Sequence, residues 1–110
     1  MNYWQAIEGK KTLFLILTKQ WYDMILSGVK KEEYRAITDY YKARLKKDFD
    51  FDVVIFRNGY SGNSRSMVVE VVKQPRVGTG KVEWGAKEGE KYYVTGLGEV
   101  IWSSEMEVAA

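Results

Sequence analysis

Ionic side chains gather in one short stretch, GVKKEEYR, from Gly28 to Arg35. Alternate side chains of an extended strand share a face, so Glu33 and Arg35 point the same way, roughly 7 Å apart. Such a pair can hold itself in place and leave Lys30, in the turn after Gly28, to contact a ligand. The alternative is an exposed strand whose surface ion pairs contribute about 0–1 kcal/mol each.

A second polar group stands in FRNGYSGNSR, at the end of an apolar run. A guanidinium, an amide and a phenol occur together at Arg57, Asn58 and Tyr60, and they can read a phosphate, a base edge and a base face. Asn58-Gly59 is also a strong turn dipeptide. An ordinary hairpin, with Arg57 capping the sheet edge, is therefore an equal interpretation of these residues.

Glu70 lies within the apolar run MVVEVV. On a strand it shares a face with Val68 and Val72, and a carboxylate on an apolar face must be paired or have its pKa raised by desolvation. Glu70 is therefore a weak candidate for a proton carrier or for a partner of Lys30 or Arg35. An exposed strand face is the slightly favoured alternative.

Two further features carry less weight. VGTGK, residues 77–81, lacks the spacing of a phosphate-binding loop and its following helix, so we reject that interpretation. Trp84, beside Gly85, is either a stacking platform at the rim of a cleft or, more often for such a residue, a core anchor.

The composition excludes several classes of site. The chain has no Cys and no His, which excludes serine–histidine triads, HExxH metalloproteases and zinc deaminases of the His/Cys type. Any catalysis must use Lys, Glu, Asp, Ser, Thr, Tyr or Arg, and no metal site or cofactor is indicated. Eight Tyr and four Trp in 110 residues are many, and such rings stack on bases.

The chain is predicted to be a single domain, 1–110, located in the cytoplasm. Its net charge of +2 is too small to prove a polyanion partner. The longest apolar run, LFLIL, is far too short to span a membrane, so no membrane partner is expected.

The first half predicts two strand–helix pairs. Thr12–Leu17 is continuously apolar and indicates a strand buried on both faces. A helix follows the capping residue Thr18 and ends at Gly28. A strand over residues 30–37 precedes a second helix, which begins at Thr38 and runs to residue 47, before a break at 48–52.

The second half predicts strands. They cover residues 51–59, then 65–74, closed by Pro75, and finally 91–102, where glycines in one or two strands suggest bulges. Residues 77–90 are expected to form a glycine-rich connection and residues 104–110 a frayed tail. The prediction is an α+β fold, a small curved or barrel-like sheet with two short helices inserted near the N-terminal half.

The first stretch also carries a family motif. Gly28, Lys30, Glu33 and Arg35 spell G-x-K-x-x-E-x-R after a short helix, which resembles the hallmark of the ASCH domain family. KKEEYR, FRNGY and WGA follow in the order seen in compact bacterial and bacteriophage ASCH domains. The resemblance covers nearly the whole chain and implies a PUA-like β-barrel with a cleft lined by this motif.

The resemblance implies an RNA- or nucleotide-binding domain. Lys30 and Arg35 would contact phosphate, and aromatic rings would stack on bases. The expected ligand-binding residues are Lys30, Glu33, Tyr34, Arg35, Arg57, Asn58, Tyr60 and Trp84.

Two alternatives remain. One ASCH branch hydrolyses N4-acetylcytidine with a lysine at the position of Lys30 and a threonine where this chain has Glu33. In an enzyme of this kind Lys30 would be the base or an electrostatic catalyst, and Glu33 or Glu70 would move protons. A threonine hydroxyl can act as a nucleophile, whereas a carboxylate in its place would pair with a cation or move protons. The other alternative is a protein-interaction module with a vestigial cleft.

Overall fold

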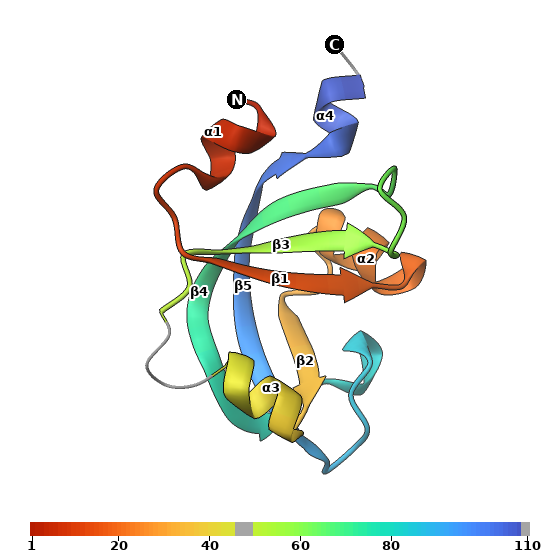
Figure 1. Ribbon diagram of the computed structural model, residues 1–110. Helices are drawn as coiled ribbons and strands as arrows, with labels where there is room; N and C mark the ends of the chain where they lie inside the picture. Colours follow the sequence, from red (N-terminus) through yellow and green to blue (C-terminus); the bar gives the residue numbers. More distant parts are fainter. Residues whose placement is uncertain (46–49, 109–110) are drawn as a thin grey trace.

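One curled five-stranded sheet carries the fold of the computed structural model, which describes residues 1–45 and 50–108 (Figure 1). The strands lie in the order β1-β3-β4-β5-β2. β1 and β3 run parallel, and the other neighbours run antiparallel. The strands are β1 (Thr12–Leu17), β2 (Glu32–Ala36), β3 (Val53–Asn58), β4 (Ser66–Thr79) and β5 (Lys91–Ser103).

Short helices accompany the sheet, so the predicted α+β class is confirmed. They are α1 (Tyr3–Ile7), α2 (Lys19–Leu26), α3 (Asp39–Arg44), α4 (Ser104–Val108) and the 3₁₀ turn η1 (Val82–Trp84). The sequence predicted α2 and α3 but not α1 or α4. Among the described residues, no helix is both long enough and apolar enough to cross a membrane.

The helix limits follow local capping signals. The Thr38 hydroxyl accepts from the backbone N–H of Tyr41, and Gly28 has φ +85°, which confirms both predicted boundaries. Thr18 is the N-cap of α2, but its side chain makes no capping bond. The predicted last turn of the second helix and part of the predicted break fall on residues 46–49, outside the described residues.

The predicted frayed tail is wrong at its start, where α4 forms. The Ser104 hydroxyl accepts from the N–H of Ser66 at 3.1 Å, and Arg65 contacts Glu105 at 3.3 Å. These contacts attach the helix to the beginning of β4.

The long strands β4 and β5 are bent by bulges. Pro75 does not end β4, because it falls in a register shift between Lys73 and Arg76, where its missing N–H is not needed. The predicted glycine-rich connection therefore loses residues 77–79 to β4. Gly96 and Gly98 lie at further shifts, which confirms the predicted bulges and makes β5 one continuous strand.

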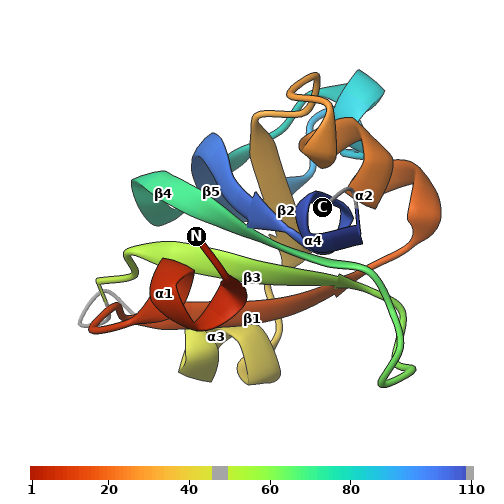
Figure 2. The same cartoon turned by 90° about the horizontal axis from the view of Figure 1, so that it is seen from above.

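Apolar side chains cover both faces of the central strands. Four successive residues of β3, Val53 to Phe56, are buried, and they alternate between two core clusters. One cluster lies under α2 and the other includes Ala6 of α1 (Figure 2). The prediction that β1 is buried on both faces is wrong, since it is an edge strand that exposes Thr12 and Phe14.

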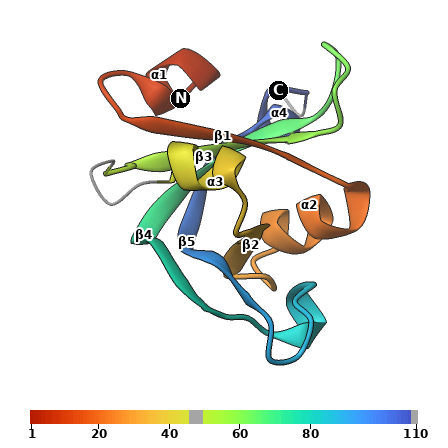
Figure 3. The same cartoon turned by 60° about the horizontal axis from the view of Figure 1, so that its bottom comes forward.

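The two edges of the sheet curl toward each other. Within the described residues, β1 pairs only with β3 and β2 only with β5, so each leaves one edge unpaired. Figure 3 shows β1 and β2 at opposite ends of the curl, with α2 and α3 beside the gap. We call this gap between the edges of β1 and β2 the seam.

Candidate functional site

Arg35 of β2 bridges the seam. One Nη2–H donates to the carbonyl of Ile16 in β1 at 2.9 Å, and Nη1 donates to the Tyr41 hydroxyl of α3 at 3.2 Å. A planar guanidinium with five donors can hold several acceptors at once. Arg35 therefore joins both edges of the sheet and one of the helices beside them.

A buried charge cluster lies behind this bridge. Arg35 holds one carboxylate oxygen of Glu33 through both Nε, at 3.1 Å, and Nη2. The Lys30 ammonium lies 3.3 Å from the other oxygen. Lys30 is 1% exposed and Glu33 is 5% exposed, so the sequence alternative of a solvated surface strand is wrong for these two side chains.

Lys30 has no free donor in this arrangement. Besides Glu33, its ammonium donates to the carbonyl of Glu32 and to that of Trp84 at 2.9 Å, which uses its three N–H groups. It also lies 4.5 Å from the centre of the Tyr34 ring. The sequence predicted that Lys30 would be left free for a ligand, whereas the structure uses it to hold β2 to the loop that carries Trp84.

Burial and pairing shift the pKa values of Lys30 and Arg35. Burial lowers the pKa of the Lys30 ammonium, although the Glu33 carboxylate opposes this change. Burial also acts to lower the pKa of Arg35, but Glu33 and Tyr41 outweigh it and the pKa lies above its ordinary value. With both cations charged against one carboxylate, the cluster carries a net positive charge.

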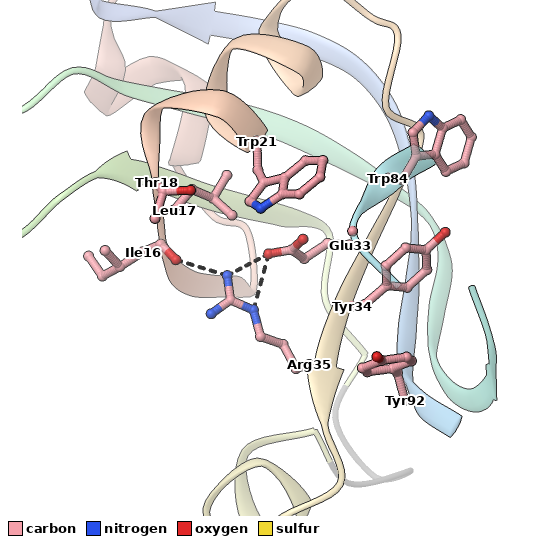
Figure 4. A pocket seen from close by; sticks show the side chains of 10 residues that line it. Ile16, Leu17, Thr18, Trp21, Glu33, Tyr34, Arg35, Trp84 and Tyr92 are labelled. Carbon is pink, nitrogen blue, oxygen red and sulfur yellow. Dashed lines mark hydrogen bonds and ion pairs between the residues drawn. The ribbon is translucent and has the colours of Figure 1, made fainter. Parts of the chain in front are cut away.

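A cavity of about 240 Å³ opens above Glu33 and Arg35 (Figure 4). Trp21, Tyr34 and Trp84 line it together with the Glu33–Arg35 ion pair. We call it the base cavity, and its lining residues are Ile16, Leu17, Thr18, Trp21, Glu33, Tyr34, Arg35, Trp84, Gly85 and Tyr92.

Two glycines let the rings approach closely. Gly85 has φ +102°, and a Cβ there would lie 2.9 Å from the Trp21 ring. A Cβ on Gly80 would lie 2.5 Å from the Tyr34 ring. Only glycine fits both contacts, so the loop from β4 to β5 sets the width of the cavity.

Polar groups around the base cavity remain available to a ligand. Within the described part of the chain, neither the indole N–H of Trp21 nor the Thr18 hydroxyl has a hydrogen-bond partner. Figure 4 shows that indole nitrogen on the side facing the Glu33–Arg35 pair. A carboxylate offers about four acceptor positions. Arg35 and Lys30 use three of those on Glu33, so one is left.

A second cavity, of about 480 Å³, adjoins the first and shares Ile16 and Arg35 with it. We call it the arginine cavity. Three arginines and several rings line it, and its lining residues are Phe14, Leu15, Ile16, Arg35, Tyr40, Tyr41, Arg44, Arg57 and Tyr60.

The structure brings together most of the predicted ligand-binding residues. Glu33, Tyr34, Arg35 and Trp84 line the base cavity, while Arg35, Arg57 and Tyr60 line the arginine cavity. Lys30 lies behind Glu33 and lines neither of these two cavities.

Two predicted residues lie elsewhere. Asn58 lines neither cavity, because its amide donates to Leu17 and accepts from Arg65 at 3.1 Å. Glu70 is exposed on β4 and accepts from the N–H of Glu99 at 3.2 Å. Glu70 is therefore not the predicted partner of the charge cluster. Glu70 and Val72 are exposed, as the favoured alternative predicted, whereas Val68, which was placed on the same face, is buried.

The sequence missed several lining residues. Trp21 was interpreted only as part of the apolar face of α2, and Tyr92 carried no motif. Tyr40, Tyr41 and Arg44 of α3 enter the arginine cavity only because α3 packs beside the seam. The abundance of aromatic residues was the one sequence signal that pointed to them.

Comparison of the chain with known proteins finds no matching family model, no matching curated protein and no matching solved structure. The resemblance to ASCH domains therefore stays a prediction that rests on the three motifs.

Proposed function

We propose that the base cavity binds a nucleobase of RNA or of a nucleotide. The observation that carries this proposal is the combination of aromatic walls with a buried, hydrogen-bonding carboxylate and guanidinium at the base of the cavity. Proteins that bind an unpaired base stack it on rings and read its edge with such groups.

The size of the cavity suits one base. Pockets for drug-sized ligands measure about 300–1,000 Å³, and the base cavity, at about 240 Å³, is smaller. Stacking a base on an aromatic side chain contributes about 1–3 kcal/mol, whatever the base. Shape and stacking therefore support a single ring system and not an extended ligand within this cavity.

The free acceptor position of Glu33 supports a base with an exocyclic amino group. Carboxylates accept from the N4 amino group of cytosine, whereas uracil has a carbonyl there. The indole N–H of Trp21 supplies a donor for a ring nitrogen or a carbonyl. We therefore expect cytosine to bind more tightly than uracil.

We also propose that the curled sheet is the PUA-like barrel of an ASCH domain. Support comes from the position of the G-x-K-x-x-E-x-R segment, whose Glu33 and Arg35 line the base cavity at the seam. A sheet of five strands with facing edges is compatible with a small, incompletely closed β-barrel.

The hydrolase alternative receives less support from the geometry. It requires Lys30 to reach the ligand, but that ammonium already has three acceptors and lies behind Glu33. Incubation with N4-acetylcytidine, read by mass spectrometry, tests it directly. If the protein turns over N4-acetylcytidine and a folded Lys30→Ala variant does not, the hydrolase alternative would replace the proposal of a binding domain.

The binding test titrates cytidine, cytidine monophosphate, uridine monophosphate and a short single-stranded RNA while tryptophan fluorescence is recorded. Trp84→Ala should weaken binding about 5- to 150-fold, which corresponds to the loss of one stacking ring. Trp4→Ala is the matched control, because Trp4 is an exposed tryptophan on α1 outside both cavities.

No binding of any of these ligands would overturn the proposal and favour a protein-interaction module. Equal affinity of Trp84→Ala and the unchanged protein would also contradict it, since the base would then lie elsewhere.

A further inference from the structure

Arg57 is an arginine without an acceptor. Its guanidinium lies 5.4 Å from the Phe14 ring, and within the described part of the chain it makes neither a hydrogen bond nor an ion pair. Its Nε is buried without a partner. A guanidinium held against a ring with its donors unused is arranged to receive an anion.

The other two arginines add donors at the same place. Arg44 makes one hydrogen bond, to the carbonyl of Phe14 at 3.3 Å, and lies over the Tyr40 ring. Arg35 uses four of its five N–H groups, so one remains. Three cationic side chains therefore meet in one cavity, each with donors to spare.

No described residue that lines the arginine cavity is acidic. The carboxylate nearest to its arginines is that of Glu33, which is already held by Arg35 and Lys30. The cavity is thus electropositive, and an anion would lose water but gain charged hydrogen bonds. Tyr40 and Tyr60 add exposed rings at this site, the latter 88% exposed.

The position of this cavity limits which anion it suits. It shares Ile16 and Arg35 with the base cavity, so the two cavities adjoin at the hydrogen bond that these residues make across the seam. A nucleotide carries its base and its phosphate at two ends of one sugar. A ligand with its base in the first cavity would bring its phosphate to the second.

We infer that the arginine cavity is a phosphate subsite, so that the protein binds a phosphorylated nucleotide unit and not a free nucleoside. This inference rests on the proposed binding of a base. It assigns Arg57 and Arg44 to the phosphate, with Arg35 shared between the two cavities. The phosphate is either the monoester of a nucleotide or a diester within single-stranded RNA.

The test compares cytidine, cytidine monophosphate and a cytidine dinucleotide by calorimetry. We expect the monophosphate to bind at least tenfold more tightly than cytidine. Arg57→Gln should remove that preference and leave the affinity for cytidine unchanged. For a short RNA it should also reduce the slope of log affinity against log salt by about 0.7, the value for one phosphate of a single strand.

Two further variants complete the design. Arg44→Gln tests the same subsite from a half-buried position, should Arg57→Gln fold poorly because its Nε is buried. Lys11→Gln is the control for charge, because this exposed lysine lies outside both cavities. A dinucleotide that binds more tightly than the monophosphate identifies the diester as the natural group, and the reverse order identifies the monoester.

The outcomes separate the two proposals. Equal binding of cytidine and its monophosphate would overturn the phosphate subsite while the base cavity stands. A preference for the monophosphate that survives both arginine substitutions would place the phosphate elsewhere and would overturn it too. Failure of every ligand, cytidine included, would overturn the base cavity itself.

Discussion

Glu33 is the residue on which both the fold and the candidate site depend. Its carboxylate lies between two cations, at the base of a cavity and behind the seam. Burial of ions costs several kcal/mol each, and attraction between them offsets this cost only when every partner is present. The cluster therefore contributes a defined geometry more than it contributes stability.

Removal of one member should consequently be costly. Lys30→Met should lower the free energy of unfolding by about 3–5 kcal/mol, because one buried oxygen of Glu33 and two carbonyls lose their donor. Urea denaturation measures the change. Lys31→Met is the control, since the neighbouring lysine is exposed and its loss should change stability by less than about 0.5 kcal/mol. Equal effects would show that the cluster is not important for folding.

The same cluster complicates mutational tests of function. Glu33→Gln would leave Lys30 and Arg35 without their shared carboxylate, so a loss of binding would not separate recognition from folding. Trp84, Arg44 and Arg57 are better probes, since each lines a cavity without belonging to this ion cluster.

Two tyrosines should make the protein sensitive to alkali. Burial is the main cause that raises the pKa of Tyr22 and of Tyr34 from the ordinary value of 10 to about 12. The unfolded chain loses these protons near pH 10, before the folded chain does. The stabilising contribution of the two tyrosines is therefore fully present below pH 10 and is lost as pH rises through about 12.

Urea unfolding on either side of pH 10 measures this loss. Tyr22→Phe should reduce it, because a ring without a hydroxyl cannot ionise in the unfolded chain. Tyr60→Phe is the control, because that ring is in water in both states. An alkaline loss unchanged by Tyr22→Phe would contradict the assignment.

At the scale of elements, the loop between β4 and β5 shapes the base cavity. Its turn η1 carries Trp84, and Gly85 then takes a left-handed conformation directly under the Trp21 ring of α2. A short loop thereby fixes the separation of two aromatic walls. A side chain at Gly85 would be strained by the positive φ, and its Cβ would also clash with the Trp21 ring.

Gly85→Ala should therefore do more harm than the same change at Gly89. Both glycines have positive φ, +102° and +77°, and alanine there costs about 1–2 kcal/mol. Only at Gly85 does the new Cβ lie within 4 Å of a neighbour, 2.9 Å from Trp21. We expect Gly85→Ala alone to shift the near-UV circular dichroism and to weaken base binding. Equal spectra for the two variants would refute this role.

At the scale of the whole molecule, the fold is a sheet that curls without closing. Bulges in β4 and β5 bend the two longest strands, which brings β1 and β2 to face each other. These two edges are joined by side chains and not by backbone pairing, and Arg35 of β2 makes the link to the Ile16 carbonyl of β1. Unpaired edges leave room for a ligand, so the seam is where the cavities lie.

Arg35→Lys tests this bridge because it keeps the charge but loses the planar set of donors. We expect a loss of about 1.5–3 kcal/mol for each charged hydrogen bond that lysine cannot replace. Hydrogen exchange should accelerate in β1 and β2 while β4, at the centre of the sheet, stays slow. Arg44→Lys is the control, and unchanged exchange in β1 would show that Arg35 does not join the edges.

The sequence by itself determined the local features. Thr38 and Gly28 set helix limits, the glycines of β5 indicated bulges, and Glu33 with Arg35 formed the predicted pair. Each of these depends on residues a few positions apart, whose interactions the chain order fixes directly. The prediction that Pro75 ends its strand was wrong. Pro75 lies in a bulge of β4 against β5, where a backbone N–H is not needed for pairing, and the sequence around Pro75 does not reveal that bulge.

Only the tertiary structure decided where the polar groups are buried and which of them meet. Lys30 lost its predicted freedom because the carbonyl of Trp84, from a loop far along the chain, lies within its reach. Trp21 and Arg57 likewise line cavities that are formed with residues from distant parts of the chain. The curl of the sheet brings these segments together. The curl results from several register shifts along β4 and β5, and their combined effect cannot be predicted from any short stretch of sequence.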